Sequence, residues 1–122
     1  MEFHYEKLDH VQLAAPANSE ETARQFYRDL LGFKEIEKPD PLRKNGGVWF
    51  RCGNVELHIG IEDPFSPAKK AHPAIRVKHL SAMKLYLDEQ GYFYTVDKNL
   101  PNAERFYLSD PFGNRIEFLE WR

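Results

Sequence analysis

Short runs in which hydrophobic and polar residues alternate mark the strands of this chain. In the first run, LDHVQLAA at residues 8–15, Val11 and Leu13 face one way and His10 faces the other, which is the period of a half-buried strand. Residues 39–47 (PDPLRKNGG) are rich in proline and glycine and are predicted to be loop and turn. Further strands are predicted at 33–38, 48–51, 55–60, 73–77, 93–97, 105–108 and 115–119.

Two helices are predicted between these strands from apolar residues at helical spacing. The first is expected after Asn18, a favourable N-cap residue, with Glu21 three positions later as in a capping box. Gly32 then lies where a C-cap glycine belongs. The second helix is expected over residues 81–90, with Ser81 as its cap and Gly91 closing it.

The second half of the chain repeats the first. At an offset of 59 residues (82 − 23), the two helices and their glycines match without a gap, in the pairs Ala23/Ala82, Tyr27/Tyr86, Asp29/Asp88, Gly32/Gly91 and Phe33/Tyr92. Each half therefore has the predicted order β-α-β-β-β. We expect one domain over residues 1–122, made of module 5–62 and module 71–121, joined by the proline-containing linker 63–70.

Each half also places a histidine near its first strand and a glutamate on its last strand. His10 matches His72 at an offset of 62 (72 − 10), and Glu56 matches Glu117 at an offset of 61 (117 − 56). Such matches would be a coincidence if all four were ordinary structural or surface residues. Two modules paired about a pseudo-twofold axis would bring the four side chains together. Two imidazoles and two carboxylates suit a divalent transition metal with open positions for Lewis-acid chemistry.

Four further residues are candidate substrate contacts. His58 shares a strand face with the predicted carboxylate ligand in VELHIG, but it aligns with a leucine in the second half. It therefore ranks as a substrate contact, unless the first module has shifted its ligand by two residues. Arg76 and Arg105 are candidates for binding an anionic group, although an ordinary surface role is favoured for both. Tyr107 shares a strand face with Arg105 and is a weaker candidate.

Composition narrows the classes of function. With 42% hydrophobic and 30% charged residues, the 122-residue chain has enough apolar material for a packed core. A net charge of −2, without long runs of either sign, gives no indication of binding to nucleic acid or an anionic membrane. The lone cysteine, Cys52, excludes an intrachain disulfide. Together with the absence of a signal-like or spanning stretch, this favours a cytoplasmic protein.

In these motifs the chain resembles the vicinal oxygen chelate superfamily. This superfamily includes glyoxalase I, fosfomycin-resistance proteins, extradiol dioxygenases and bleomycin-resistance proteins. The resemblance covers roughly Lys7 to Glu120. Its most distinctive part is FYLSDPFGNRIEFLE, and it rests also on LDHVQLAA, ARQFYRDLLGF, VELHIG and AHPAIRV. It implies an α+β fold in which two βαβββ modules form an open curved barrel, and a small-molecule substrate bound by a homodimer.

By the same resemblance, His10, His72 and Glu117 match the ligands shared by metal-dependent members, and Glu56 matches the fourth ligand of glyoxalase I-like members. The metal would be Zn, Ni, Mn, Co or Fe. The implied activity is that of a glyoxalase- or dioxygenase-type enzyme, acting on a small oxygen-chelating substrate through Lewis-acid stabilisation of an enolate or alkoxide. A carboxylate whose pKa is raised by burial would move the proton, with Glu56 the first candidate and Glu117 the second.

The family also leaves two other functions open. A fosfomycin-type thiol transferase needs only His10, His72 and Glu117, but the sequence offers no evident phosphonate site. A metal-free protein that binds and sequesters a bleomycin-like drug is compatible with the 14% aromatic content. That function leaves the matched histidines and glutamates unexplained. Extradiol dioxygenases are usually longer than this chain.

Overall fold

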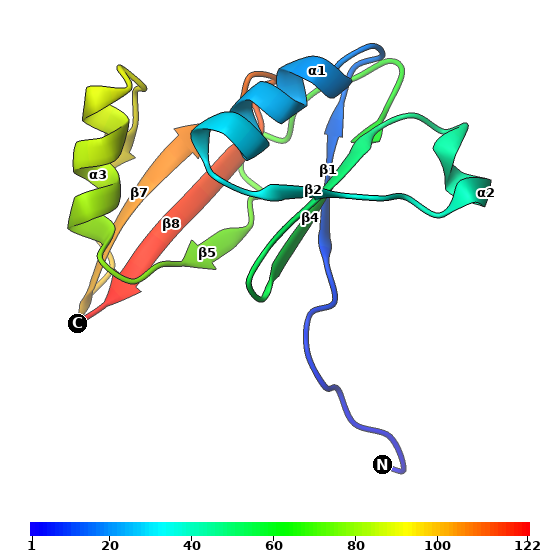
Figure 1. Cartoon of the computed structure of the whole chain (residues 1–122). Coiled ribbons are helices and arrows are strands. Elements are labelled where there is room, and N and C mark those ends of the chain that lie inside the picture. Colours follow the sequence, from blue (N-terminus) through cyan, green and yellow to red (C-terminus); the bar gives the residue numbers. More distant parts are fainter. The chain divides into compact units, whose positions relative to one another are not determined.

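The structure is a computed structural model that describes residues 1–122, in which the chain forms two compact units, Met1–Phe65 and Ser66–Arg122. Each unit contains one four-stranded sheet and its own helices (Figure 1). Residues 1–10 are an exposed, extended segment ahead of the first strand, which begins three residues later than predicted. None of the helices is long and apolar enough to cross a membrane.

The elements of unit 1 are β1 (Val11–Ala15), α1 (Glu20–Ala23), the π-helix η1 (Arg24–Leu30), β2 (Lys34–Ile36), α2 (Asp40–Arg43), β3 (Val48–Cys52) and β4 (Val55–Ile61). The strands lie in the order β1-β4-β3-β2. The first strand pairs parallel with β4, and the other neighbours are antiparallel. The parallel pair joins the first and last strands of the unit, so the N-terminal end of β1 comes beside β4.

The elements of unit 2 are β5 (Ala74–Arg76), α3 (Leu80–Glu89), β6 (Thr95–Val96), β7 (Ala103–Ser109) and β8 (Arg115–Trp121). The strands lie in the order β5-β8-β7-β6, again with the first and last strands parallel. Both units therefore have the same strand order and the same pairing directions. The predicted α+β fold with two βαβββ modules is confirmed.

The apolar face of each sheet is covered by a helix, η1 in unit 1 and α3 in unit 2. Tyr27 of η1 is fully buried and stacks on Phe50 of β3, with ring centroids 5.5 Å apart. In unit 2, Leu87 of α3 is fully buried, and Phe106 stacks on Phe118 across β7 and β8 at 5.5 Å. Because side chains alternate along a strand, the intervening residues face away from this core. The polar residues that alternate with the core positions, Arg51, Glu56, His58, Arg105 and Glu117, therefore lie on the opposite faces.

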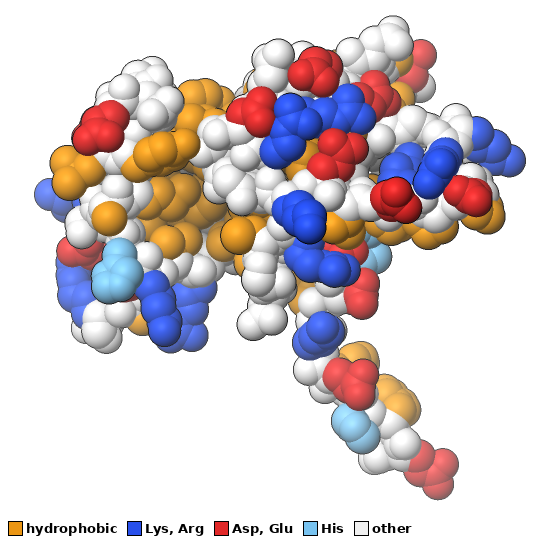
Figure 2. Space-filling view, viewed as in Figure 1, with side chains coloured by type: hydrophobic (Ala, Val, Ile, Leu, Met, Phe, Trp, Pro, Cys, Tyr) orange, Lys and Arg blue, Asp and Glu red, His pale blue; other side chains and the backbone are white.

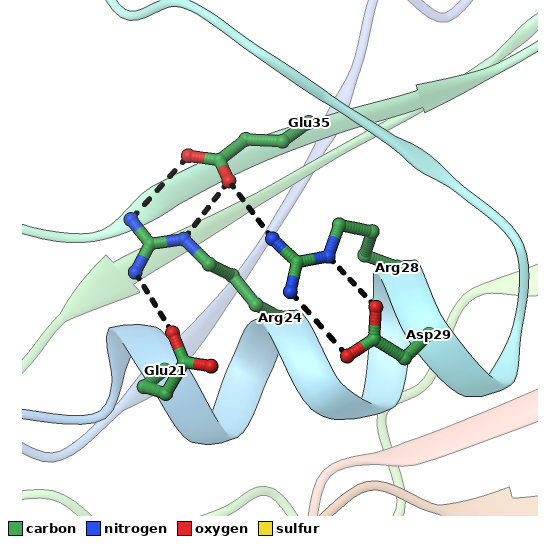
Figure 3. Close-up of polar contacts among 5 residues, drawn as sticks. All are labelled: Glu21, Arg24, Arg28, Asp29 and Glu35. Atoms are coloured by element: carbon green, nitrogen blue, oxygen red, sulfur yellow. Dashed lines mark hydrogen bonds and ion pairs between the residues drawn. The ribbon is translucent and has the colours of Figure 1, made fainter.

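A network of charges ties η1 to the edge strand β2 (Figure 3). Glu35 of β2 accepts a hydrogen bond from Arg24 Nε at 2.9 Å, and Arg28 Nη1 lies 3.9 Å from the same carboxylate. Glu21 pairs with Arg24 at 3.4 Å instead of completing a capping box, and Asp29 pairs with Arg28 at 2.8 Å. Figure 2 shows acidic and basic side chains intermingled over this part of unit 1. These pairs are half-exposed or exposed, so each adds little to the stability of the fold.

Two local predictions in unit 1 are wrong. Asn18 is not the N-cap, because its φ is 65° and Ser19 takes the cap position. The Ser19 hydroxyl donates back to Pro16 O at 2.5 Å, so it makes no hydrogen bond to the helix. The segment 39–47 is not all loop, because it contains α2, with Pro41 in its first turn. Proline is compatible with a helix start, since its fixed φ is helical and its missing N–H is not needed there.

The start of α3 is capped from another strand. His79 is the N-cap residue, with φ 61°, and its side chain makes no cap hydrogen bond, so the predicted Ser81 cap is wrong. Instead, the Glu120 carboxylate of β8 accepts hydrogen bonds from the N–H groups of His79 and Leu80, each at 3.0 Å. These donors would otherwise have no partner within the helix.

We expect Glu120→Gln to lower the Tm by about 3–6 °C at pH 7, because one charged acceptor for the helix N-terminus is lost. The Leu80 and His79 N–H groups lower the pKa of Glu120. Its contribution is therefore complete above the ordinary carboxyl range and is lost as pH falls through the lowered pKa. Thermal melts at pH 7 and pH 3 should show the two proteins converging at low pH. Glu104→Gln, on the exposed strand position opposite Glu120, is the control and should not reproduce this pattern.

Candidate metal and substrate site

The polar face of the unit 1 sheet carries a cluster around His58 of β4. Its side chain is only 4% exposed, between the rings of His10, at a centroid distance of 4.2 Å, and Trp49, at 3.7 Å. The His58 Nε2 lies 2.7 Å from Glu56 Oε2. Burial lowers the pKa of His58, which favours the neutral imidazole. Nε2–H then donates to Glu56, and the lone pair of Nδ1 is left to bind another group.

Glu56 is held by an arginine that sequence reasoning missed. Arg51 Nη2 lies 2.6 Å from Glu56 Oε1. Hydrogen bonds from Arg51 and then from His58 lower the pKa of Glu56. The raised pKa expected of a catalytic carboxylate is therefore not found at Glu56. The partnership was accessible from the sequence, because the two-residue turn Gly53-Asn54 places Arg51 opposite Glu56 in the β3–β4 hairpin.

Unit 2 brings His72 together with Glu117. The His72 Nδ1 lies 2.8 Å from Lys70 O, and Nε2 lies 3.0 Å from Glu117 Oε1. A carbonyl oxygen only accepts hydrogen bonds, so Nδ1 carries the proton. In the neutral ring, Nε2 then presents a lone pair to a nearly fully buried carboxylate. Two hydrogen-bond acceptors, His72 Nε2 and Glu117 Oε1, therefore face each other. A proton or a cation between them would satisfy both.

His10 is oriented in a similar way in unit 1. Its Nδ1 lies 2.9 Å from Asp9 Oδ1, so Nδ1–H donates to the carboxylate and Nε2 carries the lone pair. Metal-binding histidines commonly donate their second N–H to a carboxylate or a backbone carbonyl in this manner. Both histidines matched by the internal repeat thus have Nδ1 occupied and Nε2 available as a ligand.

Of the predicted substrate contacts, Arg105 lies in the unit 2 cluster and Arg76 does not. Arg105 pairs with Glu117 at 3.5 Å and with Asp97 at 3.4 Å, so its charge is already engaged by two carboxylates. Arg76 is exposed on β5. The Tyr107 ring meets the His72 ring edge-on, with centroids 5.3 Å apart. Asp97 had not been singled out from the sequence, where it lies at the end of a weakly patterned strand.

The strand register changes which unit 1 residue corresponds to Glu117. On the parallel pairs, Gln12 lies opposite His58 and Ala74 lies opposite Glu117. Gln12 and Ala74 are 62 residues apart (74 − 12), the same offset as the two matched histidines. Hence His58, rather than Glu56, occupies the position equivalent to Glu117. The assignment of Glu56 as a metal ligand stays a prediction.

The donors of these clusters suit a divalent metal in type, but they are not gathered into one group. No group of three or more His, Cys, Asp or Glu side chains is arranged to hold a metal ion; the donors occur instead as pairs within each unit. In octahedral coordination, two ligands bound at about 2.1 Å and at right angles lie about 3.0 Å apart. His72 Nε2 and Glu117 Oε1 have this separation, 3.0 Å. Imidazole nitrogen and carboxylate oxygen are donors that divalent transition metals bind, and this pair would supply two of the ligands.

The fold and the paired donors define a two-module α+β protein with a histidine–carboxylate pair in each module. A family model, Glyoxalase/Bleomycin resistance protein/Dioxygenase superfamily, matches residues 7–118, and the chain belongs to this superfamily. A glyoxalase family protein from Bacillus anthracis is similar at 51% identity and a TM-score of 0.96, covering 100% of both chains.

More distant relatives differ in what their names state. A protein named Glyoxylase I 4, from Arabidopsis thaliana, is 26% identical over 124 aligned positions, covering 93% of this chain and 70% of that protein. An antibiotic binding protein from a Streptomyces species is 22% identical with a TM-score of 0.72, covering 97% of this chain and 100% of the other. The second likeness shows only a shared fold.

Proposed function

We propose that the chain is a divalent-metal-dependent enzyme of the glyoxalase type, acting on a small oxygen-chelating substrate. The observation that carries the proposal is His72, whose Nδ1–H is held by Lys70 O while Nε2 faces Glu117 at 3.0 Å. This is the orientation that a histidine ligand needs. The similarity to a protein named for glyoxalase I supports the same class of enzyme.

In this proposal the ligands are those implied by the family resemblance, His10, His72 and Glu117, with His58 as the fourth. His58 is chosen over Glu56 because its register matches that of Glu117. Glu56 accepts the His58 N–H and, with Arg51, orients that ring. When bound, the metal supplies Lewis-acid stabilisation of negative charge on a substrate oxygen.

We assign to Glu117 the role of accepting a proton from the substrate. A carboxylate with a lowered pKa is a weak base, and the pKa of Glu56 is lowered by Arg51 and His58. Glu117 is buried, at 5% exposure, and its nearest cation, Arg105, lies 3.5 Å away. Arg51 lies closer to Glu56, at 2.6 Å, so on this geometry we assign the proton to Glu117.

Element analysis of untagged protein, never exposed to a nickel column, tests the proposal directly. We expect about one divalent metal per chain, or uptake to that level after removal and titration. Protein that carries no metal and takes none up at stoichiometric amounts would contradict the proposal.

The two candidates for the fourth ligand can be separated by mutation. His58→Ala removes the proposed ligand, so metal affinity should fall by more than about 100-fold. Glu56→Gln keeps a hydrogen-bond acceptor beside His58, so the loss should stay within the roughly 10–100-fold typical of residues that orient a ligand. Competitive titration with a chromogenic chelator measures both. A larger loss of metal affinity in Glu56→Gln than in His58→Ala would identify Glu56, and not His58, as the ligand.

A metal-free binding protein is the second candidate. It is favoured by the absence of any group of three donors suited to a metal, and the fold is shared with an antibiotic binding protein. Under this function, Glu117→Gln would keep the affinity for a bound drug, whereas the proposed enzyme would lose both metal and activity.

A further inference from the structure

A cavity in unit 2 is lined by cations and aromatic rings. Its volume is about 690 Å³, and the charged side chains in its lining are Lys69 and Arg115, without an acidic residue. Tyr92, Phe93 and Tyr107 supply aromatic walls. Pockets of this size commonly hold small molecules, and the lining favours a ligand that has both a negative charge and an apolar body.

Arg115 is oriented for such a ligand. Its guanidinium carbon lies 3.8 Å from the centroid of the Tyr107 ring, a distance at which the group lies against the ring face. This leaves the N–H edge available for bidentate contact with a carboxylate. Arg115 forms no ion pair with a carboxylate, although its charge acts on Asp97. Six other arginines form such ion pairs: Arg24, Arg28, Arg43, Arg51, Arg105 and Arg122.

The apolar part of the cavity is only partly covered by the chain itself. Phe93, one of the lining residues, is 82% exposed. A large exposed aromatic side chain beside a cavity gains free energy when a ligand covers it. The body of the ligand is therefore expected to lie against Phe93, with its charged end toward Arg115.

We propose that this cavity binds a small carboxylate with an apolar or aromatic body, through Arg115 and Lys69 at the carboxylate and Phe93 at the body. Tyr107 contacts both Arg115 and His72, so the bound molecule lies one side chain from the proposed metal ligand. That the molecule is the substrate rests on the proposed function, whereas its binding does not. The anion contacts in this proposal are Arg115 and Lys69, whereas the sequence prediction named Arg76 and Arg105.

Calorimetric titration of 2-naphthoate into metal-free protein tests the inference. We expect binding that is at least about tenfold tighter than that of the neutral 2-naphthamide, because a charge-assisted bidentate contact is lost in the amide. Arg115→Gln should weaken naphthoate binding by about tenfold or more, and Lys69→Gln by a smaller factor. Arg43→Gln, on α2 in unit 1, is the control and should leave binding unchanged.

The inference would be overturned by the absence of naphthoate binding, by equal binding of the amide, or by retained affinity in both Arg115→Gln and Lys69→Gln. Tighter binding of 2-naphthyl phosphate than of naphthoate would show that the ligand class is wrong. Lys69 is exposed before β5, so its variant remains informative if Arg115→Gln fails to fold. Metal analysis of the same protein is read separately, so a failed carboxylate site is distinguishable from a failed metal site.

Discussion

His72→Ala should lose stoichiometric metal binding, with affinity reduced by more than about 100-fold. The change removes Nε2, which lies 3.0 Å from Glu117 Oε1 and is the donor already oriented by Lys70 O. Loss of a ligand is expected to exceed the roughly 10–100-fold effect of removing a residue that only orients one. The measurement is the metal content of dialysed, untagged protein, followed by titration of the metal-free form.

His4→Ala is the matched control, because His4 lies in the exposed segment before β1. It should keep the metal content and affinity of the unmodified protein. His72 itself is partly exposed, so His72→Ala should fold, and its circular dichroism should be unchanged. A folded His72→Ala protein that keeps its metal would remove His72 from the ligand set.

Gly47→Ala should destabilise unit 1 by about 3 kcal/mol or more. Gly47 has φ +90°, and a Cβ at this position would lie 2.2 Å from Ile59 O of β4. The clash is with backbone, so no side-chain rotation relieves it. The Gly47 N–H also donates to Glu20 Oε2 at 2.8 Å, and a shift of this segment would break that bond. Urea unfolding of metal-free protein measures the loss without a contribution from ligand binding.

Gly53→Ala separates the effect of the clash from the effect of backbone conformation. Gly53 also has a positive φ, +56°, but a Cβ there would meet nothing within 4 Å. Gly53→Ala should lower the free energy of unfolding by only about 1–2 kcal/mol, the cost of holding a residue with a side chain in the left-handed conformation. Equal losses in the two variants would mean that the contact with Ile59 O relaxes freely.

Much of the fold could be predicted from the sequence because the evidence is local and periodic. Alternation located the strands, and the match of Gly32 with Gly91 revealed the two modules; both glycines close their helices at positive φ, 81° and 69°. The cap of α3 could not be predicted, since Glu120 lies 40 residues from Leu80 in the chain. No local pattern reports which distant carboxylate reaches a helix N-terminus.

The candidate site was harder to predict for a related reason. Matching VEL with IEF aligned Glu56 with Glu117, whereas the strand register aligns His58 with Glu117. A shift of two residues keeps a side chain on the same face of a strand. The alternation of hydrophobic and polar residues therefore cannot detect such a shift. The prediction that His10 and His72 are ligands is untouched by this shift.

The separate hydrogen-bonding of the two sheets has a consequence for assembly. Every strand pairs within its own unit, so no backbone hydrogen bond of either sheet depends on the chain that connects them. Two copies of the protein exchanging a whole module would need only a different path for linker 63–70. Domain swapping is thus open to this architecture at little enthalpic cost, and a homodimer with exchanged modules would be detected by proteolysis in the linker followed by sizing of the fragments.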